Sequence, residues 1–345
     1  MPSKEELQML QALPLEIKVM KTQQRIREWV QYYGENGVAV SFSGGKDSTV
    51  LLHLVRKLYP DIEAVFINSG LEYPEIQQFV KTFDNVTILR PKMRFDEVIK
   101  KYGYPFISKQ VSLCVRSFKQ GSKWAKLSFE GKHNQTEEPN EYIQNRYGKW
   151  KELVNLDFNI SDKCCGIMKE KPLIEYKRKT GKVSFVGIMT EESTRREKAW
   201  LKTGCNAFDS AEPISKPLSF WTNQDVLKYI KQNNLPLASV YGEVVYGSRN
   251  NVEKYDNLLC DCGMTLCATG CDRTGCIFCG FGAHLDKGES RFERLKRTHP
   301  KQYNYCMGGG AYDTDGLWKP TKDGLGLRHC IDVLNSIYGE NFIKY

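Results

Sequence analysis

The stretch Ser43-Gly44-Gly45-Lys46-Asp47-Ser48 decides the fold of this chain. An apolar run over residues 38–42 precedes it, and residues 49–55 after it repeat apolar side chains at helical spacing. The predicted order is therefore strand, glycine loop, helix. Two adjacent glycines let backbone N–H groups approach a phosphate, the helix that begins near Ser48 directs its positive end at it, and Lys46 adds a charge. This arrangement predicts a site for nucleotide phosphates.

The loop differs from the two commonest phosphate-binding patterns. It lacks the four residues that a Walker loop places between its first glycine and Gly-Lys-Ser/Thr, and it lacks the three glycines of the Rossmann pattern. Ser-Gly-Gly-Lys-Asp-Ser resembles instead the PP-loop of ATP pyrophosphatases. That resemblance implies cleavage of ATP between its α- and β-phosphates to adenylate a substrate. A glycine-rich turn in an ordinary core is the alternative interpretation.

The composition fits a chain that buries a substantial core. Its 345 residues allow one large or two modest domains. Lys and Arg number 50 against 41 Asp and Glu, and the net charge of +9 suits a polyanion such as ATP and permits nucleic-acid binding. The sequence shows no apolar signal segment and no apolar run long enough to span a bilayer, so we expect a cytoplasmic protein without a membrane partner.

Strand and helix patterns alternate through the first hundred residues. We expect a helix over residues 7–33, strands over 63–68 and 86–89, a helix opened by Pro74 and another over 95–102. This alternation predicts an α/β fold with a doubly wound parallel sheet. Ligands of such sheets bind beyond the carboxyl ends of the strands, where the glycine loop and Asn68-Ser69-Gly70 should both emerge.

The sequence predicts a division of the chain near residue 235. Residues 1–235 are expected to form the nucleotide-binding domain, with a polar, partly helical insertion at about 121–160. A strand over 183–188 and a helix over 223–231, capped by Thr222, should complete that domain. Residues 236–345 are expected to form a cysteine-rich metal or iron–sulfur region with C-terminal helices.

Further motifs resemble the phosphoadenosine phosphosulfate (PAPS) reductase family of the PP-loop superfamily. Residues 66–75 resemble the family's substrate loop, although Asn68 stands where aspartate is usual. The other matching segments, in the family's order, are Cys164-Cys165 with 169–173, then 187–196, 217–226 and 275–279. Together they cover about residues 38–282.

This resemblance implies a set of nucleotide contacts. They are Ser43, Gly44, Gly45, Lys46, Asp47, Ser48, Asn68, Ser69, Gly70, Arg195 and Arg196. Backbone groups of the two loop glycines would hold the phosphates of ATP, and both serines would donate hydrogen bonds. Lys46 and Asp47 are the expected catalytic residues: Lys46 would stabilise charge as pyrophosphate leaves, and Asp47 would position Mg²⁺. Both arginines would bind phosphate bidentately.

Twelve cysteines in an expected reducing compartment are interpreted first as metal or iron–sulfur ligands. In the cluster-containing branch of the family, an adjacent cysteine pair and a later Cys-x-x-Cys bind a [4Fe–4S] cluster. The resemblance therefore implies Cys164, Cys165, Cys276 and Cys279 as ligands here. Cys271 or Cys306 is the alternative to one of the adjacent pair. A second set, Cys260, Cys262, Cys267 and Cys271, would suit a tetrahedral structural zinc.

Three functions remain open at this stage. The first is an ATP pyrophosphatase with an iron–sulfur cluster that serves sulfur transfer or modification of a nucleic acid or small molecule, together with a sulfur donor or partner protein. The second is a PAPS or adenosine phosphosulfate reductase with a relocated thiol, since residues 339–345 lack the family's usual Cys-Gly-Leu-His-like tail. Cys330 could supply that thiol if the adjacent His329 lowers its pKa. The third is a nucleotide-binding partner subunit without turnover.

The segment from Lys287 to Tyr303 is basic. It carries six Lys and Arg residues against two Glu, interleaved with aromatic side chains. The pattern is compatible with contacts to a nucleic-acid backbone, and a solvated helix face is the alternative.

Overall fold

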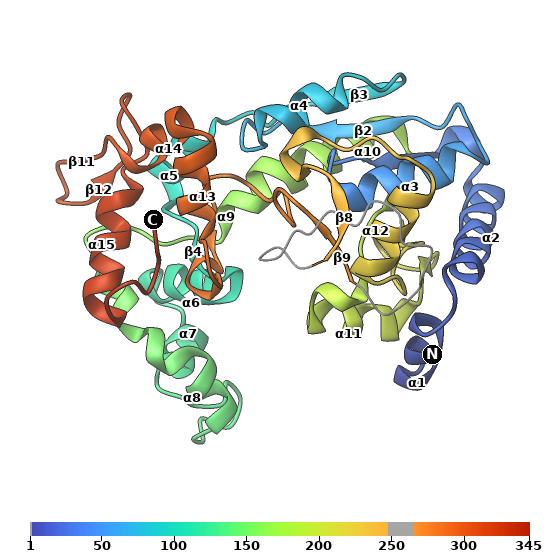
Figure 1. Cartoon of the computed structure of the whole chain (residues 1–345). Helices are drawn as coiled ribbons and strands as arrows, with labels where there is room; N and C mark the ends of the chain where they lie inside the picture. Colours follow the sequence, from blue (N-terminus) through green and yellow to red (C-terminus); the bar gives the residue numbers. More distant parts are fainter. Residues whose placement is uncertain (1, 248–264) are drawn as a thin grey trace. The chain divides into compact units, whose positions relative to one another are not determined.

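The computed structural model describes residues 2–247 and 265–345 (Figure 1). These residues form two compact units. Unit 1 comprises 1–68, 72–90 and 172–274, and unit 2 comprises 69–71, 91–171 and 275–345. Both units are therefore built from discontinuous segments, which differs from the single division near residue 235 expected from the sequence. Local sequence patterns do not reveal that a chain leaves one unit and later returns to it.

Unit 1 is built on a sheet that has six strands among the described residues. Their spatial order is β3-β2-β1-β5-β7-β6, all parallel except β6, which is antiparallel to β7. The strands span Val38–Ser41 (β1), Ala64–Ile67 (β2), Val86–Leu89 (β3), Val183–Val186 (β5), Asn206–Ala207 (β6) and Ile214–Ser215 (β7). A short antiparallel pair, β8 (Val244–Tyr246) and β9 (Leu266–Ala268), lies in the same unit. The predicted α/β fold with a parallel sheet is confirmed.

In the described part of the chain, unit 1 contains helices that the sequence predicts and two that it does not, α10 (Lys171–Thr180) and α11 (Thr194–Thr203). The predicted helices are α1 (Lys4–Gln11), α2 (Leu15–Tyr33), α3 (Lys46–Arg56), α4 (Pro74–Val80) and α12 (Asn223–Gln232). One helix was expected over residues 7–33, but the chain breaks before Leu15 because Pro14 has no N–H for a continuing helix. The helix capped by Thr222 is confirmed, with a capping box between Thr222 and Asp225.

The two faces of the sheet are covered by different helices. On one face, Ala39 of β1 and Val65 of β2 form a buried cluster with Tyr176 of α10. The opposite face receives α3, which packs against β1, and α2 and α12 pack against α3 in turn. Val40, Val50 and Leu54 are fully buried there. This double cover fixes β1 and α3, and therefore the loop between them, on a rigid scaffold.

Unit 2 consists mainly of helices. They are α5 (Phe95–Tyr102), α6 (Lys109–Lys119), α7 (Lys123–Phe129), α8 (Glu141–Tyr147), α9 (Lys163–Cys165), α13 (Arg291–Thr298), α14 (Pro300–Met307) and α15 (Leu327–Tyr338). Two short pairs of strands complete it: β4 (Phe106–Ile107) is parallel to β10 (Gly280–Phe281), and β11 (Ala311–Tyr312) is antiparallel to β12 (Trp318–Lys319). Within the expected insertion, α7 and α8 confirm the partly helical prediction. Across the described ranges, no helix is long and apolar enough to cross a membrane.

Candidate nucleotide-binding site

The glycine loop connects the end of β1 to the first turn of α3, as the sequence predicts. Gly44 has a φ of +71°, a conformation that favours glycine. A Cβ atom at Gly44 would also lie 2.8 Å from a methyl group of Ile76 and 2.8 Å from one of Val80, both in α4. Only glycine fits this position, so the backbone of the loop can lie against α4.

The two serines of the loop hold its shape. Ser48 Oγ donates a hydrogen bond to the Gly45 carbonyl at 2.9 Å and accepts one from the Ser43 N–H at 3.1 Å. The Gly45 N–H donates to Ser43 Oγ at 3.3 Å. Both hydroxyl groups are therefore engaged inside the turn, and their contact with a phosphate stays a prediction.

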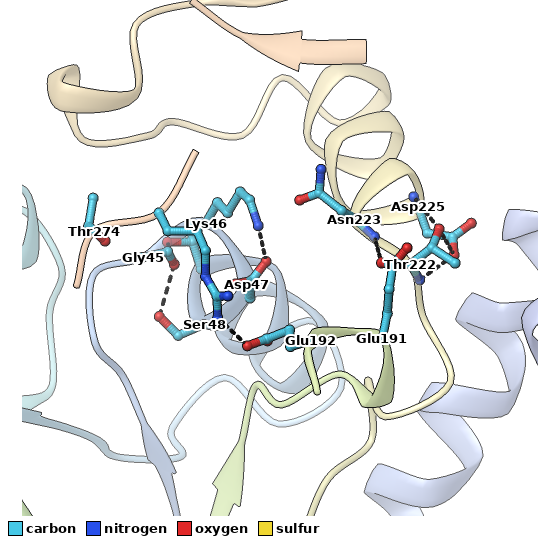
Figure 2. A network of polar contacts seen from close by, with 12 residues as sticks. Gly45, Lys46, Asp47, Ser48, Glu191, Glu192, Thr222, Asn223, Asp225 and Thr274 are labelled. Atoms are coloured by element: carbon cyan, nitrogen blue, oxygen red, sulfur yellow. Dashed lines mark hydrogen bonds and ion pairs between the residues drawn. The ribbon is translucent and has the colours of Figure 1, made fainter. Parts of the chain in front are cut away.

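Lys46 begins α3 and is only 5% exposed. Its Nζ lies 2.6 Å from Asp47 Oδ1, as Figure 2 shows. Its backbone N–H donates to the phenolic oxygen of Tyr241 at 3.1 Å, and this oxygen also lies 2.9 Å from Thr274 Oγ1. Burial raises the pKa of Tyr241, which keeps the phenol neutral at physiological pH. The positive end of α3, a buried ammonium group and a carboxylate thus meet at one point.

Arg196 lies within electrostatic range of this point. Burial and the positive charge of Arg273 lower the pKa of Arg196, whereas the charge of Asp47 raises it. Glu192, labelled in Figure 2, forms ion pairs with Arg196 and with Arg273. Arg195, by contrast, is exposed. Of the two predicted arginines, the structure brings Arg196 to the loop.

Gly187 explains how the segment that carries Arg196 comes so close. It follows β5, and a Cβ atom there would lie 3.1 Å from the backbone oxygen of Asp47. The connection between β5 and α11 can therefore touch the first turn of α3. Sequence reasoning matched this segment to a family motif without recognising this role of its glycine, and nothing in the sequence pointed to Tyr241, Thr274, Glu192 or Arg273.

The predicted substrate loop is divided between the units. Asn68 follows β2 in unit 1, where its N–H donates to the Leu89 carbonyl at 2.8 Å. Ser69 and Gly70 belong to unit 2. Their contact with a nucleotide stays a prediction.

All four predicted cluster ligands belong to unit 2. Cys164 and Cys165 form α9, and Cys276 and Cys279 precede β10 in a turn closed by a 3.1 Å hydrogen bond from the Cys279 N–H to the Cys276 carbonyl. Burial raises the pKa of the Cys164 thiol, and the charges of the other three cysteines raise it further. The four thiols are thus close enough to interact electrostatically.

This donor set has the chemistry that a [4Fe–4S] cluster requires, namely four thiols from two separate segments. Burial and the charge of Cys276 raise the pKa of Cys279 to about 12, while the guanidinium group of Arg291 acts against this rise. Arg291 also donates to the Cys279 carbonyl at 3.2 Å. Within residues 2–247 and 265–345, no group of three or more His, Cys, Asp or Glu side chains is arranged so that it could hold a metal ion. The residue types fit a cluster, whose binding stays a prediction.

The expected zinc site cannot be assembled from the structure. Cys260 and Cys262 lie outside the described residues, while Cys267 and Cys271 belong to unit 1. Cys306, an alternative cluster ligand, is fully buried in α14, and burial raises the pKa of its thiol. The zinc site and the alternative cluster ligands, Cys271 and Cys306, therefore stay predictions.

Residues 37–108 and 122–280 match the sequence profile of the phosphoadenosine phosphosulfate reductase domain. The chain belongs to the PAPS reductase family. Among its relatives, the adenosine 5′-phosphosulfate reductase of Staphylococcus epidermidis is 23% identical over 220 residues, which cover 63% of this chain and 70% of that protein. The phosphoadenosine 5′-phosphosulfate reductase of Proteus mirabilis is 25% identical over 234 residues, which cover 66% and 75%.

The chain is also similar to an uncharacterized protein and to a solved structure. An uncharacterized protein of Methanocaldococcus jannaschii is 26% identical over 290 residues, or 82% of this chain, but the chain spans only about half (51%) of its length. A solved PAPS reductase of Candida auris, in a phosphate complex, aligns with a TM-score of 0.37 at 14% identity and covers 75% of this chain and 98% of that one.

In this PAPS reductase family member, the condition under which Cys330 could supply the thiol, a pKa lowered by His329, is not met. Its side chain has 0% exposure, and burial raises its pKa well above the usual value. A hydrogen bond with Tyr104 acts in the opposite direction but does not offset burial. Burial therefore disfavours the thiolate form of Cys330, the form that would attack sulfur.

Proposed function

We propose that this protein binds ATP with Mg²⁺ at the glycine loop and cleaves it between the α- and β-phosphates, so that an acceptor becomes adenylated. In the proposed pathway the adenylated acceptor then receives sulfur from a donor or partner protein. The acceptor is a nucleic acid or a small molecule.

One observation carries this proposal: buried Lys46, with Asp47 bonded to it, stands at the amino-terminal end of α3, and Arg196 approaches from another segment. Three positive features, namely two side chains and the end of a helix, converge on one loop. Such a concentration suits a triphosphate better than a single carboxylate or sulfate. Asp47, the carboxylate that pairs with Lys46, is the kind of group that binds Mg²⁺.

The geometry suggests how each group would act. The acceptor's nucleophile forms a bond to the α-phosphorus as the bond to the bridging oxygen breaks, and pyrophosphate leaves with the electron pair. Lys46 and Arg196 would stabilise the negative charge that develops on the leaving group, and Asp47 would hold Mg²⁺, which would neutralise part of the charge of the phosphates. Backbone N–H groups of the loop orient the chain of phosphates.

The cluster belongs to the same proposal. Cys164, Cys165, Cys276 and Cys279 would hold a [4Fe–4S] cluster, which supplies redox or sulfur-binding chemistry when bound. The guanidinium group of Arg291, beside the Cys279 carbonyl, would offset part of the negative charge of four thiolates.

A sulfonucleotide reductase is the second candidate, favoured by the names of the relatives from Staphylococcus epidermidis and Proteus mirabilis. It would use the same loop for a sulfonucleotide instead of ATP. It would also require a reactive thiol, and the complete burial of Cys330 argues against that residue.

Nucleotide turnover by anaerobically purified protein tests the proposal. We expect ATP with Mg²⁺ to yield pyrophosphate or an adenylated product when candidate acceptors are supplied, and Lys46→Ala to abolish most of this activity. Lys57→Ala, at the exposed opposite end of α3, is the matched control and should retain it. Release of sulfite from a sulfonucleotide with a thiol reductant, without consumption of ATP, would establish the reductase instead. ATP binding without turnover of either nucleotide would indicate a partner subunit.

A further inference from the structure

A pocket lies within unit 2, and its lining residues come after the last residue that matches the family profile. Its volume is about 520 Å³, and its lining includes Asn304, Met307, Trp318, Arg328, His329 and Asp332. These residues come from α14, β12 and the first half of α15. The family's phosphate loop and cysteine motifs do not contribute to this pocket.

One wall of the pocket is a fixed aromatic surface. The ring centroids of Trp318 and His329 lie 4.3 Å apart at an interplanar angle of 34°. The Trp318 indole N–H donates to the Gly326 carbonyl at 3.0 Å. Its ring lies so close to Gly310 that a Cβ atom there would be 2.3 Å from it. The indole is therefore held in one orientation although it is only partly buried.

The imidazole of His329 is anchored from behind. Its Nε2 lies 2.7 Å from Asp157 Oδ2, and the Tyr312 hydroxyl donates to the same oxygen at 2.7 Å. Burial alone would raise the pKa of Asp157, but the hydrogen bonds from Tyr312 and His329 lower it below its usual value. The carboxylate is therefore charged at neutral pH and fixes the orientation of the ring that packs on Trp318.

We propose that this pocket binds one unpaired base of a single-stranded nucleic acid. Trp318 and Met307 supply apolar surfaces for a flat ring, and stacking on an aromatic side chain is the usual way in which proteins bind unpaired bases. The Asn304 amide and the Asp332 carboxylate offer donors and an acceptor to the edge of the base. Arg328 supplies a cation for the attached phosphate. Binding requires neither ATP nor a cluster, so this inference stands apart from the proposed function.

The charges along α14 suggest where the rest of the strand runs. Lys301 lies one turn before Asn304 on the same face of α14, which places a cation beside the pocket. The basic segment recognised in the sequence contributes less than its composition implies, because Arg294 and Arg297 both pair with Glu289. Lys301 and Arg328 are the cations that we assign to phosphate groups.

Binding of a short fluorescein-labelled single strand, measured by anisotropy with the full-length protein and no ATP, tests the pocket. Both RNA and DNA strands of mixed sequence are used at about 50 mM salt, where phosphate contacts are strong. We expect Trp318→Ala to weaken binding about tenfold, which corresponds to the loss of one stacked base. Trp318→Phe should restore most of the affinity. Tyr142→Ala removes an aromatic side chain that is 66% exposed on α8 and should leave affinity unchanged.

The dependence of affinity on salt concentration tests the phosphate contacts separately. If Trp318 had only a structural role, removing Lys301 or Arg328 would not change this dependence. Lys301→Ala and Arg328→Ala should each reduce the slope of log affinity against log salt by about one, since each removes one phosphate contact. Lys100→Ala, an exposed cation on α5, should leave the slope unchanged.

Three outcomes would overturn the proposal. The first is absence of single-strand binding by the unmodified protein at low salt. The second is unchanged affinity of a Trp318→Ala protein whose circular dichroism shows that it is folded. The third is competition by AMP and UMP as strong as that by the unlabelled strand, which would assign the pocket to a free mononucleotide. A Lys46 variant that has lost ATP turnover should still bind the single strand, so failure of the proposed function can be distinguished from failure of this proposal.

Discussion

The phenolic oxygen of Tyr241 accepts a hydrogen bond from the backbone N–H of Lys46 at 3.1 Å, across 195 positions in the sequence. That N–H is one of the donors at the start of α3 that would otherwise be available to an anion. Tyr241 and a phosphate oxygen can therefore serve as acceptors for the same group. This relationship makes the stability of the loop dependent on the nucleotide in a way that can be measured.

We expect Tyr241→Phe to destabilise the protein by about 1–3 kcal/mol in the absence of nucleotide, because a buried N–H loses its acceptor. Addition of ATP with Mg²⁺ should recover part of this loss, since a phosphate oxygen can accept the same hydrogen bond. Thermal unfolding with and without nucleotide measures the difference. Tyr229→Phe is the matched control: its buried hydroxyl lies 3.0 Å from His53 Nδ1, and its loss should not be recovered by ATP. Equal recovery in both variants would contradict the prediction.

Substitution of the two adjacent arginines should affect ATP binding differently. Arg196→Ala should weaken ATP binding about tenfold or more, because a hydrogen bond from a charged group contributes about 1.5–3 kcal/mol. Arg195→Ala should change it little, since that side chain is exposed, whereas Arg196 is partly buried and within range of the charge of Asp47. Calorimetric titration with a non-hydrolysable ATP analogue gives both dissociation constants. A larger effect at Arg195 would show that the segment turns when nucleotide binds.

Comparison of alanine substitutions at Gly44 and Gly181 separates the cost of backbone strain from the cost of steric contact. Both have a φ near +70°, so an alanine at either position costs about 1–2 kcal/mol of backbone strain. Only at Gly44 would the new methyl group meet other side chains, those of Ile76 and Val80 at 2.8 Å, whereas the surroundings of Gly181 are open. Gly44→Ala should therefore lower the free energy of unfolding in urea by about 1–3 kcal/mol more than Gly181→Ala. Equal losses would show that α4 moves to accommodate the methyl group.

The sequence predicted those features that depend on neighbouring residues and missed those that depend on residues far apart in the chain. The order of β1, loop and α3 was predictable because apolar spacing and adjacent glycines are local patterns. Tyr241 was not, since its contact with Lys46 depends on tertiary folding across 195 positions. The discontinuous units escaped prediction for the same reason.

The two arginines and Cys330 show a related limit. A motif matched Arg195 and Arg196 equally, and only the rotation of α11 distinguishes the exposed side chain from the half-buried one. The proximity of His329 to Cys330 in the sequence suggested an activated thiol. In the helix their side chains separate: His329 bonds to Asp157, while Cys330 turns into the core. Adjacency in the sequence therefore says little about contact on a helix.

Cys330 should remain unreactive across the neutral pH range. Burial raises its pKa, so the thiolate appears only at a pH above that of an ordinary cysteine, and alkylation needs the thiolate. Iodoacetamide at pH 7 to about 8.5, the usual cysteine pKa, should label Cys330 only after unfolding. Peptide mapping by mass spectrometry, with urea-unfolded protein as the control, measures this. Rapid labelling of Cys330 in the folded protein would return it to consideration as a nucleophile.

The cluster predicts a specific pattern of iron loss. Anaerobically purified protein should be brown and contain about four iron and four sulfide per chain when one cluster is fully loaded. Cys276→Ser and Cys279→Ser should each lose most of the iron, because the oxygen of serine is a poorer ligand for it than a thiolate. Cys164→Ser and Cys165→Ser should do the same, since both thiols belong to the group of four that interact in unit 2.

Cys114→Ser is the matched control for that series. Its thiol is fully buried in α6 of the same unit, where it contacts the Ala125 carbonyl. None of the four predicted ligands is among the groups that shift its pKa. The iron content of this variant should be unchanged after correction for any loss of folded protein. If one variant of the adjacent pair keeps its iron while Cys306→Ser or Cys271→Ser loses it, the fourth ligand is the residue from that alternative set. Zinc without iron or sulfide, in protein never exposed to oxygen, would exclude the cluster, because oxidative loss of iron could not then explain its absence.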